Sequence, residues 1–411
     1  MYIADMNIRN LILLAVVTVG VTVDVSAQWI KGAGIPDSMS IIRSVVRGEN
    51  GVLVANSWGD GVFMSTDDGV SWTSHVAGLP RVGGQYVTVN TAAVHNGNVY
   101  IGTVLRGIWR YDTSVGEWKH LRGFDSTTIH SMVVHNDVVY AGCFRSGIVR
   151  IVQTDKVESE YVPAFGDGLT VIQLVSAHGK LFVGTNRDGW NIYDPDANVL
   201  SDDNRGFLTE RPFGVWPRAF AADGSSLTAV LGDNLMGGGV YARSSDTDEW
   251  QRYEDGFPLV FQTIFGAAAV GTTYFVSTGY FGGQGVYVRT RGQQQWSPWN
   301  EGLPNLDIEG VVAWRRQSDT VRVVVASRQI GLWYRDTIVP TTSVYEPIVR
   351  PERKVPTFTV HRNDVPIIIA REGLCYLYDL AGRRFAPDAV GTGVFLGGCS
   401  SHPRTVLLIV Q

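Results

Sequence analysis

The sequence contains few residues arranged as catalytic motifs require. It has no G-x-S-x-G nucleophile elbow, no H-E-x-x-H zinc motif and no glycine-rich phosphate loop. Asp307 and Glu309 are two neighbouring carboxylates, but a glycosidase needs carboxylates on both sides of a cleft, and no partner can be placed for this pair. The His-Asn turns at His95 and His135 are expected to be solvent-exposed rather than metal-binding. We therefore predict a protein that is not an enzyme and holds neither a cofactor nor a metal ion.

Arginine and aromatic side chains form a more informative pattern. They recur in segments expected to join strands on one face of the fold, and such side chains on loops of a rigid scaffold suit ligand recognition. The predicted ligand-binding residues are Trp58, Tyr86, Arg106, Phe144, Arg145, Arg187, Trp216, Arg218, Phe261, Tyr280, Phe281 and Arg328. Four of these Arg recur shortly before a repeated glycine, where they could ring a channel mouth and favour an anionic ligand. The alternative is that these are ordinary loop side chains, with the aromatic ones packed between repeats.

A repeat of about 45 residues, the length of a propeller blade, must position these loops. A glycine followed by two apolar or aromatic residues starts a strand-like run seven times from Gly61 to Gly331, at spacings of 46, 40, 42, 50, 46 and 46 residues. In four blocks a Trp follows eleven residues later: Trp72, Trp118, Trp250 and Trp296. Each block holds four strand-like runs, as a β-propeller blade does. We predict an all-β, seven-bladed β-propeller over residues 28–340.

The two ends of the repeat region complement each other. The seventh block lacks the expected Trp after its third strand, whereas residues 28–36 contain Trp29 and resemble the ends of the other blocks. We predict that this N-terminal segment supplies the outer strand of the last blade. That pairing would close the ring and remove an exposed strand edge.

Composition and charge agree with many short strands and exclude several classes of protein. The 411 residues include 47 Gly and 12 Trp, and only 18% are charged, which excludes a disordered chain or a coiled coil. The net charge of −5 supplies no basic footprint, so we expect no nucleic-acid partner. We expect a monomer whose partner is a protein or glycan that the sequence does not identify.

The N-terminus has the features of an export signal. Residues 11–23 form an apolar run too short to span a hydrocarbon core of about 30 Å comfortably, and Ala27 suits cleavage by signal peptidase. We expect residues 1–27 to be removed, which leaves no transmembrane helix; an uncleaved anchor is the alternative. The three Cys residues allow one disulfide, between Cys375 and Cys399, or three buried thiols.

Residues 65–72 match the Asp-box pattern S-x-D-x-G-x-[ST]-W, with Ser65, Asp67, Gly69 and Trp72 at fixed positions. The sequence here resembles the Asp-box (BNR-repeat) propellers of bacterial sialidases, sortilin-like receptors and photosystem II assembly factors. Residues 100–112 resemble the propeller repeat of two-component sensor ectodomains. These resemblances imply a fold rather than a function, and the Asp-box role is mainly structural. The sialidase F/Y-R-I-P motif is absent, which favours a non-catalytic binding protein. The resemblances leave two alternatives: a secreted, sialidase-like glycan-active hydrolase and an assembly factor.

The C-terminal segment resembles the type A sorting domain of the type IX secretion system. Residues 341–356 contain three Pro and are predicted to be a linker. In residues 357–411 the matching positions are Tyr378, Asp379, Gly382, Arg383 and Gly393. The customary Asn-Pro is absent and the chain does not end in basic residues. The resemblance implies a small β-sandwich, recognition by type IX secretion machinery, and location at the cell surface or in the medium; an appendage without a sorting role is the alternative.

Overall fold

The computed structural model describes most of the chain after the predicted signal peptide. The described residues are 28–36, 41–123, 125–153, 156–158, 169–186, 189–207, 217–223, 226–231, 239–245, 248–257, 263–279, 283–340 and five strands between Thr357 and Val410. Only the backbone is described for the five C-terminal strands and for several other strand residues, Arg218 among them. The predicted signal peptide (1–27) and linker (341–356) lie outside the described residues.

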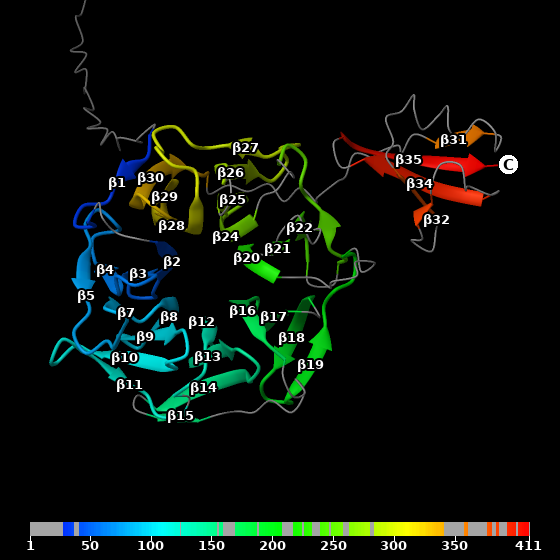
Figure 1. Cartoon of the computed structure of the whole chain (residues 1–411). Helices are drawn as coiled ribbons and strands as arrows, with labels where there is room; N and C mark the ends of the chain where they lie inside the picture. Colours follow the sequence, from blue (N-terminus) through cyan, green and yellow to red (C-terminus); the bar gives the residue numbers. More distant parts are fainter. Residues whose placement is uncertain are drawn as a thin grey trace, which may run out of the picture.

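The described chain is built almost entirely from short antiparallel strands. Within it, strand pairing gives seven four-stranded sheets, one five-stranded sheet near the C-terminus and one two-stranded hairpin. The four-stranded sheets are arranged around a central axis, with the first strand of each innermost (Figure 1). We call each of these sheets a blade and number the blades along the chain. The prediction of an all-β propeller is thus confirmed.

The strands of a blade follow one another outward from the axis. Blades one to three comprise β2 (Ile42–Arg47), β3 (Leu53–Ser57), β4 (Val62–Ser65) and β5 (Thr73–His75); β8 (Val89–His95), β9 (Asn98–Thr103), β10 (Ile108–Asp112) and β11 (Glu117–His120); and β12 (Ile129–His135), β13 (Val138–Cys143), β14 (Gly147–Gln153) and β15 (Lys156–Glu158). Blades four to six comprise β16 (Val171–Ala177), β17 (Lys180–Thr185), β18 (Gly189–Asp194) and β19 (Val199–Asp202); β20 (Pro217–Asp223), β21 (Ser226–Leu231), β22 (Gly239–Arg243) and β23 (Gln251–Arg252); and β24 (Thr263–Val270), β25 (Thr273–Gly279), β26 (Gly285–Thr290) and β27 (Ser297–Pro298). Blade seven comprises β28 (Ile308–Gln317), β29 (Thr320–Ser327), β30 (Gly331–Ile338) and, from the start of the described chain, β1 (Ile30–Lys31).

The second strands of the blades are covered on both faces because the blades stack on one another. Every residue of β29 is buried, as is every residue of β25. A strand covered on both sides is apolar along its length instead of alternating, which explains the continuous apolar runs in the sequence. The core therefore consists of layers between blades. One such layer packs Trp72 of blade one against Trp314 and Val324 of blade seven.

The repeated Trp and Gly residues join each blade to the next. The N–H of Trp72 donates to the Ala33 carbonyl at 3.0 Å, and the same bond joins Trp118 to Ala77, Trp250 to Arg205 and Trp296 to Asp255. A glycine with positive φ follows each acceptor: Gly34, Gly78, Gly206 and Gly256. A Cβ on any of these glycines would lie 2.1–2.7 Å from the carbonyl oxygen of the contacted Trp. Both residue types therefore recur because the blades approach each other there through their backbones.

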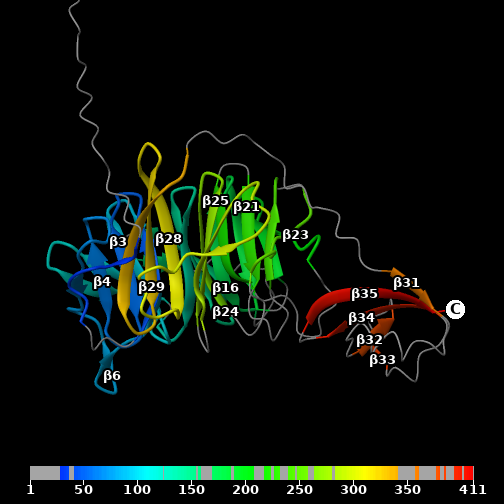
Figure 2. The same ribbon diagram turned by 90° about the horizontal axis from the view of Figure 1, so that it is seen from above.

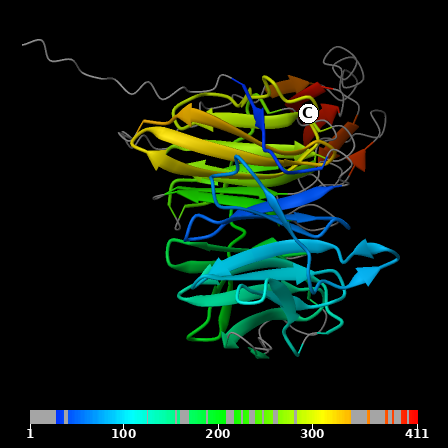
Figure 3. The same ribbon diagram turned by 90° about the vertical axis from the view of Figure 1, so that its left-hand side faces the viewer.

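The N-terminal segment completes blade seven, as expected from its sequence. β1 pairs antiparallel with β30, with Ile30 opposite Tyr334 and Lys31 opposite Trp333. The N–H of Trp29 donates to the Glu301 carbonyl at 3.1 Å, which repeats the bond made by the other blade Trp residues. The ring is closed by this pairing, and Figure 3 shows blade seven (yellow) beside blade one (blue).

Buried charges also join blades seven and one. The Arg322 side chain, which is 4% exposed, donates to both carboxylate oxygens of Asp336 at 2.6 and 2.7 Å. It also donates to the backbone carbonyl of Asp68 in blade one at 3.0 Å. Arg316 approaches the Asp68 carboxylate at 3.1 Å. This seam is therefore held by directed charge-assisted hydrogen bonds as well as by apolar packing.

The C-terminal strands form one five-stranded sheet. Its order is β31 (Thr357–Val360), β35 (His402–Val410), β34 (Gly393–Cys399), β32 (Tyr376–Asp379) and β33 (Arg384–Phe385). The prediction for this segment was a β-sandwich; hydrogen bonds join all the described strands into one sheet, so the second layer of a sandwich is not found among them. Of the predicted sorting residues, Tyr378 and Asp379 end β32 and Gly393 begins β34. Gly382, Arg383 and Cys375 lie outside the described residues.

Candidate binding site at the channel mouth

A β-bulge recurs near the start of the innermost strand of each blade. In β2 the register shifts between Ile42 and Ser44, so Arg43 is an extra residue without a partner on β3. The equivalent residues of the later blades are Asn90, His130, Ile172, Arg218, Phe265 and Glu309. A bulge bends its strand and re-aims the extra side chain. Together with Arg43, these residues form a ring at the channel end where the inner strands begin, and we call this set the bulge ring.

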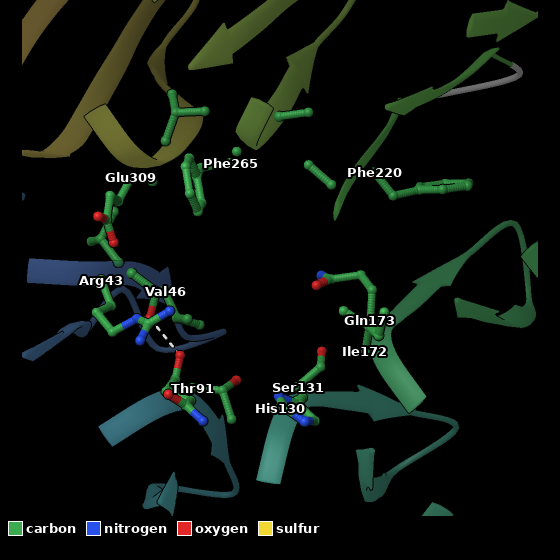
Figure 4. Close-up of a pocket in the computed structure, with 18 of the residues that line it drawn as sticks. Arg43, Val46, Thr91, His130, Ser131, Ile172, Gln173, Phe220, Phe265 and Glu309 are labelled. Carbon is green, nitrogen blue, oxygen red and sulfur yellow. Dashed lines mark hydrogen bonds between the residues drawn. The ribbon is translucent and has the colours of Figure 1, made fainter. Parts of the chain in front are cut away.

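The bulge ring surrounds a cavity of about 280 Å³ (Figure 4). This volume is close to the lower limit of about 300 Å³ for small-molecule sites. Blades seven, one, two and three line the cavity with polar ring members: Glu309, Arg43, Asn90 and His130. Apart from Gln173, blades four, five and six line it mainly with apolar side chains: Ile172, Ala219, Phe220, Phe265 and Ala267. The described side chains are therefore polar on one side of the cavity and, apart from Gln173, apolar on the other.

Arg43 is half-buried at the polar side of the cavity. Its guanidinium carbon lies 5.4 Å from the ring centroid of Trp58, a cation–π contact. Trp58 follows β3 and remains 46% exposed. Within the described residues, the Arg43 guanidinium donates no hydrogen bond. The aromatic ring thus holds a guanidinium whose donors are not used by the neighbouring blades.

Glu309 is the one carboxylate among the described residues that line the cavity. It is 5% exposed, and its Oε1 lies 3.2 Å from Nη1 of Arg328. Burial raises the pKa of the Glu309 carboxyl, while the positive charges of Arg43 and Arg328 oppose the rise. Asp307 has a different role, because its Oδ1 accepts the N–H of Gly283 from blade six at 2.8 Å. Asp307 therefore joins blade seven to blade six by a hydrogen bond, whereas Glu309 faces the channel.

His130, at the polar side of the cavity, packs against the loop between β13 and β14 of blade three. Its ring centroid lies 6.1 Å from that of Phe144, which is 46% exposed in the loop between β13 and β14. The Arg145 guanidinium carbon lies 5.2 Å from the Phe144 ring. The loops of blades one, three and seven thus each place a predicted residue against a member of the bulge ring.

Hydrogen bonds between blades fix the wall just below the ring. The Thr91 hydroxyl accepts the N–H of Met132 at 3.0 Å, and the Ser131 hydroxyl accepts the N–H of Leu174 at 3.0 Å. The Ser44 hydroxyl donates to the Asn90 carbonyl at 3.3 Å, the contact dashed in Figure 4. Each bond ties the inner strand of one blade to that of the next. The cavity is therefore built on paired strands rather than on loops alone.

The structure brings four of the predicted ligand-binding residues to this mouth: Trp58, Phe144, Arg145 and Arg328. Tyr86 lies instead in the hairpin of β6 (Arg81–Val82) and β7 (Gln85–Tyr86), where Arg81 donates to its hydroxyl at 2.7 Å. The strand β6 projects from the body of the blades (Figure 2). Arg218 belongs to the bulge ring by its backbone position. Arg187, Trp216, Phe261, Tyr280 and Phe281 lie outside the described residues.

Of the four Arg residues expected to ring the channel mouth, Arg187 lies outside the described residues, so the expectation of one ring stays a prediction. Arg106 stands directly before its glycine, whereas Arg328 stands three residues before its own. The two therefore occupy different positions in their loops. Arg106 is exposed and does not line the cavity, whereas Arg328 directly follows β29 and pairs with Glu309.

His135 was expected to be exposed, but its exposed fraction is 2%. Blade four covers it, and the Ser176 hydroxyl lies 3.0 Å from its Nδ1.

The bulge ring was not predicted from the sequence. Its members differ in chemical type, so no shared residue marks the position. The available signal was distance: in blades one to four the ring residue lies 17 or 18 residues before the glycine that starts the third strand. A search of equivalent repeat positions for unlike residues would have found them.

Ser65 and Asp67 organise the turn between β4 and β5, at the opposite end of blade one from the channel mouth. The Ser65 hydroxyl donates to Asp67 at 2.8 Å and accepts the N–H of Gly69 at 3.0 Å. The N–H of Ser71 donates to Asp67 at 2.9 Å, and the Trp72 indole donates to the Gly69 carbonyl at 3.0 Å. These residues therefore act on the turn and not on the cavity.

In the described residues, no group of three or more His, Cys, Asp or Glu is placed to hold a metal ion. No helix in this part of the chain has the length and apolar character needed to cross a bilayer.

No protein-family model matches the sequence, and no curated protein matches it. Solved structures are similar in fold. One is the extracellular domain of a putative hybrid two-component system from B. thetaiotaomicron, with a TM-score of 0.58 and 15% identity over 75% of this chain and 39% of that domain. The GH74 xyloglucanase from Xanthomonas campestris gives a TM-score of 0.57 and 12% identity over 75% of this chain and 53% of the enzyme.

The Dos1 propeller gives a TM-score of 0.50 and 11% identity over 75% of this chain and 95% of that propeller. The chain spans less than half the length of the sensor ectodomains that it matches. At these identities the similarity concerns the fold alone. The chain thus has the β-propeller fold found in both extracellular sensor domains and a glycan-degrading enzyme.

Proposed function

We propose that the protein is an exported, non-catalytic binding protein whose ligand site is the channel mouth. The observation that carries this proposal is the bulge ring. Repeat positions that serve the fold keep their residue type, as the glycine and Trp contacts between blades do. The ring positions instead carry unlike residues: charged Arg43, Arg218 and Glu309, polar Asn90 and His130, and apolar Ile172 and Phe265. Such variety at equivalent positions is typical of a recognition site built on a repeated scaffold.

The wall of the cavity supports a binding role because it is fixed before any ligand arrives. Hydrogen bonds from Thr91 and Ser131 join neighbouring inner strands directly below the ring. Side chains held on paired strands lose less conformational freedom on binding than side chains on free loops. A rigid, chemically mixed cavity therefore favours selective binding of a small molecule or of a small part of a larger glycan or protein.

Catalysis by a pair of carboxylates is the alternative for a propeller with a channel cavity. Glycoside hydrolysis needs two carboxyl groups on either side of the scissile bond. Among the described lining residues Glu309 alone is a carboxylate, and it is already paired with Arg328. We therefore favour binding over hydrolysis. The purified protein should release no product from xyloglucan or from fluorogenic sialosides and glucosides, and turnover abolished by Glu309→Gln would reverse this assignment.

Export is proposed from both ends of the chain. We assign residues 1–27 as a signal peptide, 28–340 as a seven-bladed Asp-box-type propeller, 341–356 as a linker and 357–411 as a type IX sorting-like domain. Extracellular domains among the structures of similar fold support this location. Intact-mass analysis of the secreted or surface-bound protein should give an N-terminus at Gln28 and reveal whether the segment after residue 340 has been removed.

A fluorine label can report directly on occupancy of the channel mouth. The full chain is produced with 5-fluorotryptophan, and Trp58→Phe identifies the Trp58 resonance. We expect at least one class in a panel of sugars, carboxylates, amines and amides to shift this resonance saturably. Ile172→Phe, which fills the cavity from its apolar side without touching Trp58, should abolish the shift. If no class shifts the Trp58 resonance, the channel mouth is not a binding site.

A further inference from the structure

The polar side of the cavity holds a guanidinium group, that of Arg43, whose hydrogen-bond donors no described residue uses. Arg43 and Arg328 both act on Glu309, but the Arg328 guanidinium, 3.2 Å from Glu309 Oε1, makes the ion pair. Arg43 forms no ion pair with a described residue and is held by the Trp58 ring instead. The carboxylates of Glu309 and Asp307 both lie near the two guanidinium groups, yet no described residue accepts a hydrogen bond from Arg43.

The geometry of Arg43 is suited to one kind of group. A guanidinium carries five N–H donors in a planar fork that matches the two oxygens of a carboxylate. Stacking on an aromatic ring occupies the face of the guanidinium and leaves its in-plane donors available. A half-buried guanidinium that donates no hydrogen bond to a described residue is best satisfied by an anionic ligand.

The opposite side of the cavity limits what else the ligand can carry. Ile172 and Phe265 line it from blades four and six (Figure 4). Polar groups placed against these side chains would lose hydrogen bonds to water without replacement. The volume of about 280 Å³ limits the part of the ligand inside the cavity to the size of a small molecule.

We infer that the channel mouth binds a small organic acid that has an apolar body. Arg43 binds the carboxylate of this acid, and the cavity wall formed by Ile172 and Phe265 encloses its apolar part. This inference rests on the proposed function and specifies its ligand class. Arg43 is the anchoring residue, and Arg328 keeps Glu309 neutralised so that the incoming carboxylate is not repelled.

The test uses 3-(4-fluorophenyl)propionate, its neutral amide and acetate as probes of the full-length protein, followed by the Trp58 resonance and by the fluorine signal of the probe. The acid should bind at least tenfold more tightly than the amide and more tightly than acetate. Arg43→Gln should weaken binding of the acid at least tenfold, and Arg43→Lys should restore part of it. Arg106→Gln is the matched control, because Arg106 lies on the same face without lining the cavity. Unchanged thermal unfolding of each variant shows that it is folded.

The outcomes separate this inference from the proposed function. Equal binding of acid and amide, or acid binding unaffected by Arg43→Gln, overturns the assignment of a carboxylate ligand while leaving a binding site at the mouth. Tighter binding of glucuronate than of the fluorophenyl acid overturns the apolar part of the assignment and favours an acidic sugar. If neither these probes nor any other class shifts the Trp58 resonance, both the inference and the proposed function fail.

Discussion

The α-carbon of Gly34 lies so close to Trp72 that a Cβ on it would be 2.1 Å from the Trp72 carbonyl oxygen. Gly34 belongs to the N-terminal segment that completes blade seven, and Trp72 belongs to blade one, so this contact crosses the seam at which the ring closes. Gly34 also has a φ of 82°, a conformation that residues with a Cβ rarely adopt. Two independent requirements therefore demand glycine at this position.

Gly34→Ala is expected to lower the free energy of unfolding by about 3 kcal/mol or more, because the left-handed backbone costs about 1–2 kcal/mol and the collision with Trp72 adds to it. Urea unfolding followed by Trp fluorescence provides the measurement. Gly97→Ala is the control, since Gly97 has a φ of 72° but nothing within 4 Å of the added Cβ. It should show the backbone cost alone. Equal losses in the two variants would mean that the contact with Trp72 does not hold the seam.

The charges at the same seam predict a second large effect. Asp336→Ala removes the partner of the buried Arg322 guanidinium and should lower the free energy of unfolding by about 3–5 kcal/mol. Glu301→Ala breaks the pair with Arg335, in which the Glu301 side chain is 62% exposed, and should cost less than about 1 kcal/mol. Differential scanning calorimetry compares the two. A small loss for Asp336→Ala would indicate that water reaches Arg322 when the carboxylate is removed.

The propeller was predictable from the sequence because its structural contacts repeat as residue types. The glycine and Trp contacts between blades, such as Gly78 with Trp118, require those types at each blade junction where the contact is made. The binding cavity was not predictable in the same way. A bulge depends on the register between two strands, and the ring that the bulges create holds residues as different as Arg43 and Ile172. Arg106 and Arg328 looked alike in sequence, yet an offset of two residues along the loop separates their positions.

The turn between β4 and β5 predicts a modest, pH-dependent effect. Burial alone would raise the pKa of Asp67, but hydrogen bonds from Ser71 and Ser65 outweigh it and hold the pKa below the usual 3.8. The stabilisation by the charged carboxylate is therefore complete above pH 3.8 and is lost as the pH falls through the lower folded-state value. Asp67→Ala should cost about 1–2 kcal/mol at pH 7.

The pH-dependent part of the Asp67 effect should be below about 1 kcal/mol, because the carboxylate is exposed. Asp67→Asn is the comparison, since its amide oxygen still accepts the Ser71 N–H and should retain most of the stability at pH 7. Urea unfolding at pH 7 and pH 3 measures both variants. An equal loss for the Asn and Ala variants would show that the charge, rather than the hydrogen-bond pattern, stabilises the turn.

The ionised side chains of Glu309 and Glu301 are expected to change the free energy of unfolding in opposite directions as the pH rises. Burial raises the pKa of Glu309 in the folded state, so its ionised form is penalised by folding; that penalty is complete above the folded pKa and disappears as the pH falls toward 4.5. Glu309→Gln removes the charge and keeps an acceptor for Arg328. We expect this variant to be at least as stable as the native protein at pH 7.5, with the difference vanishing near pH 4.5.

The hydrogen bond from Arg335 lowers the pKa of Glu301, so its carboxylate stabilises the fold above pH 4.5 and loses that effect as the pH falls through the folded value. Glu301→Gln should therefore be slightly less stable than the native protein at pH 7.5, by less than about 1 kcal/mol because Glu301 is exposed. Unfolding free energies of both variants across pH 4–8 test the pair. A destabilisation by Glu309→Gln that matches Glu301→Gln in sign and pH range would show that attraction to Arg43 and Arg328 outweighs burial at the channel mouth.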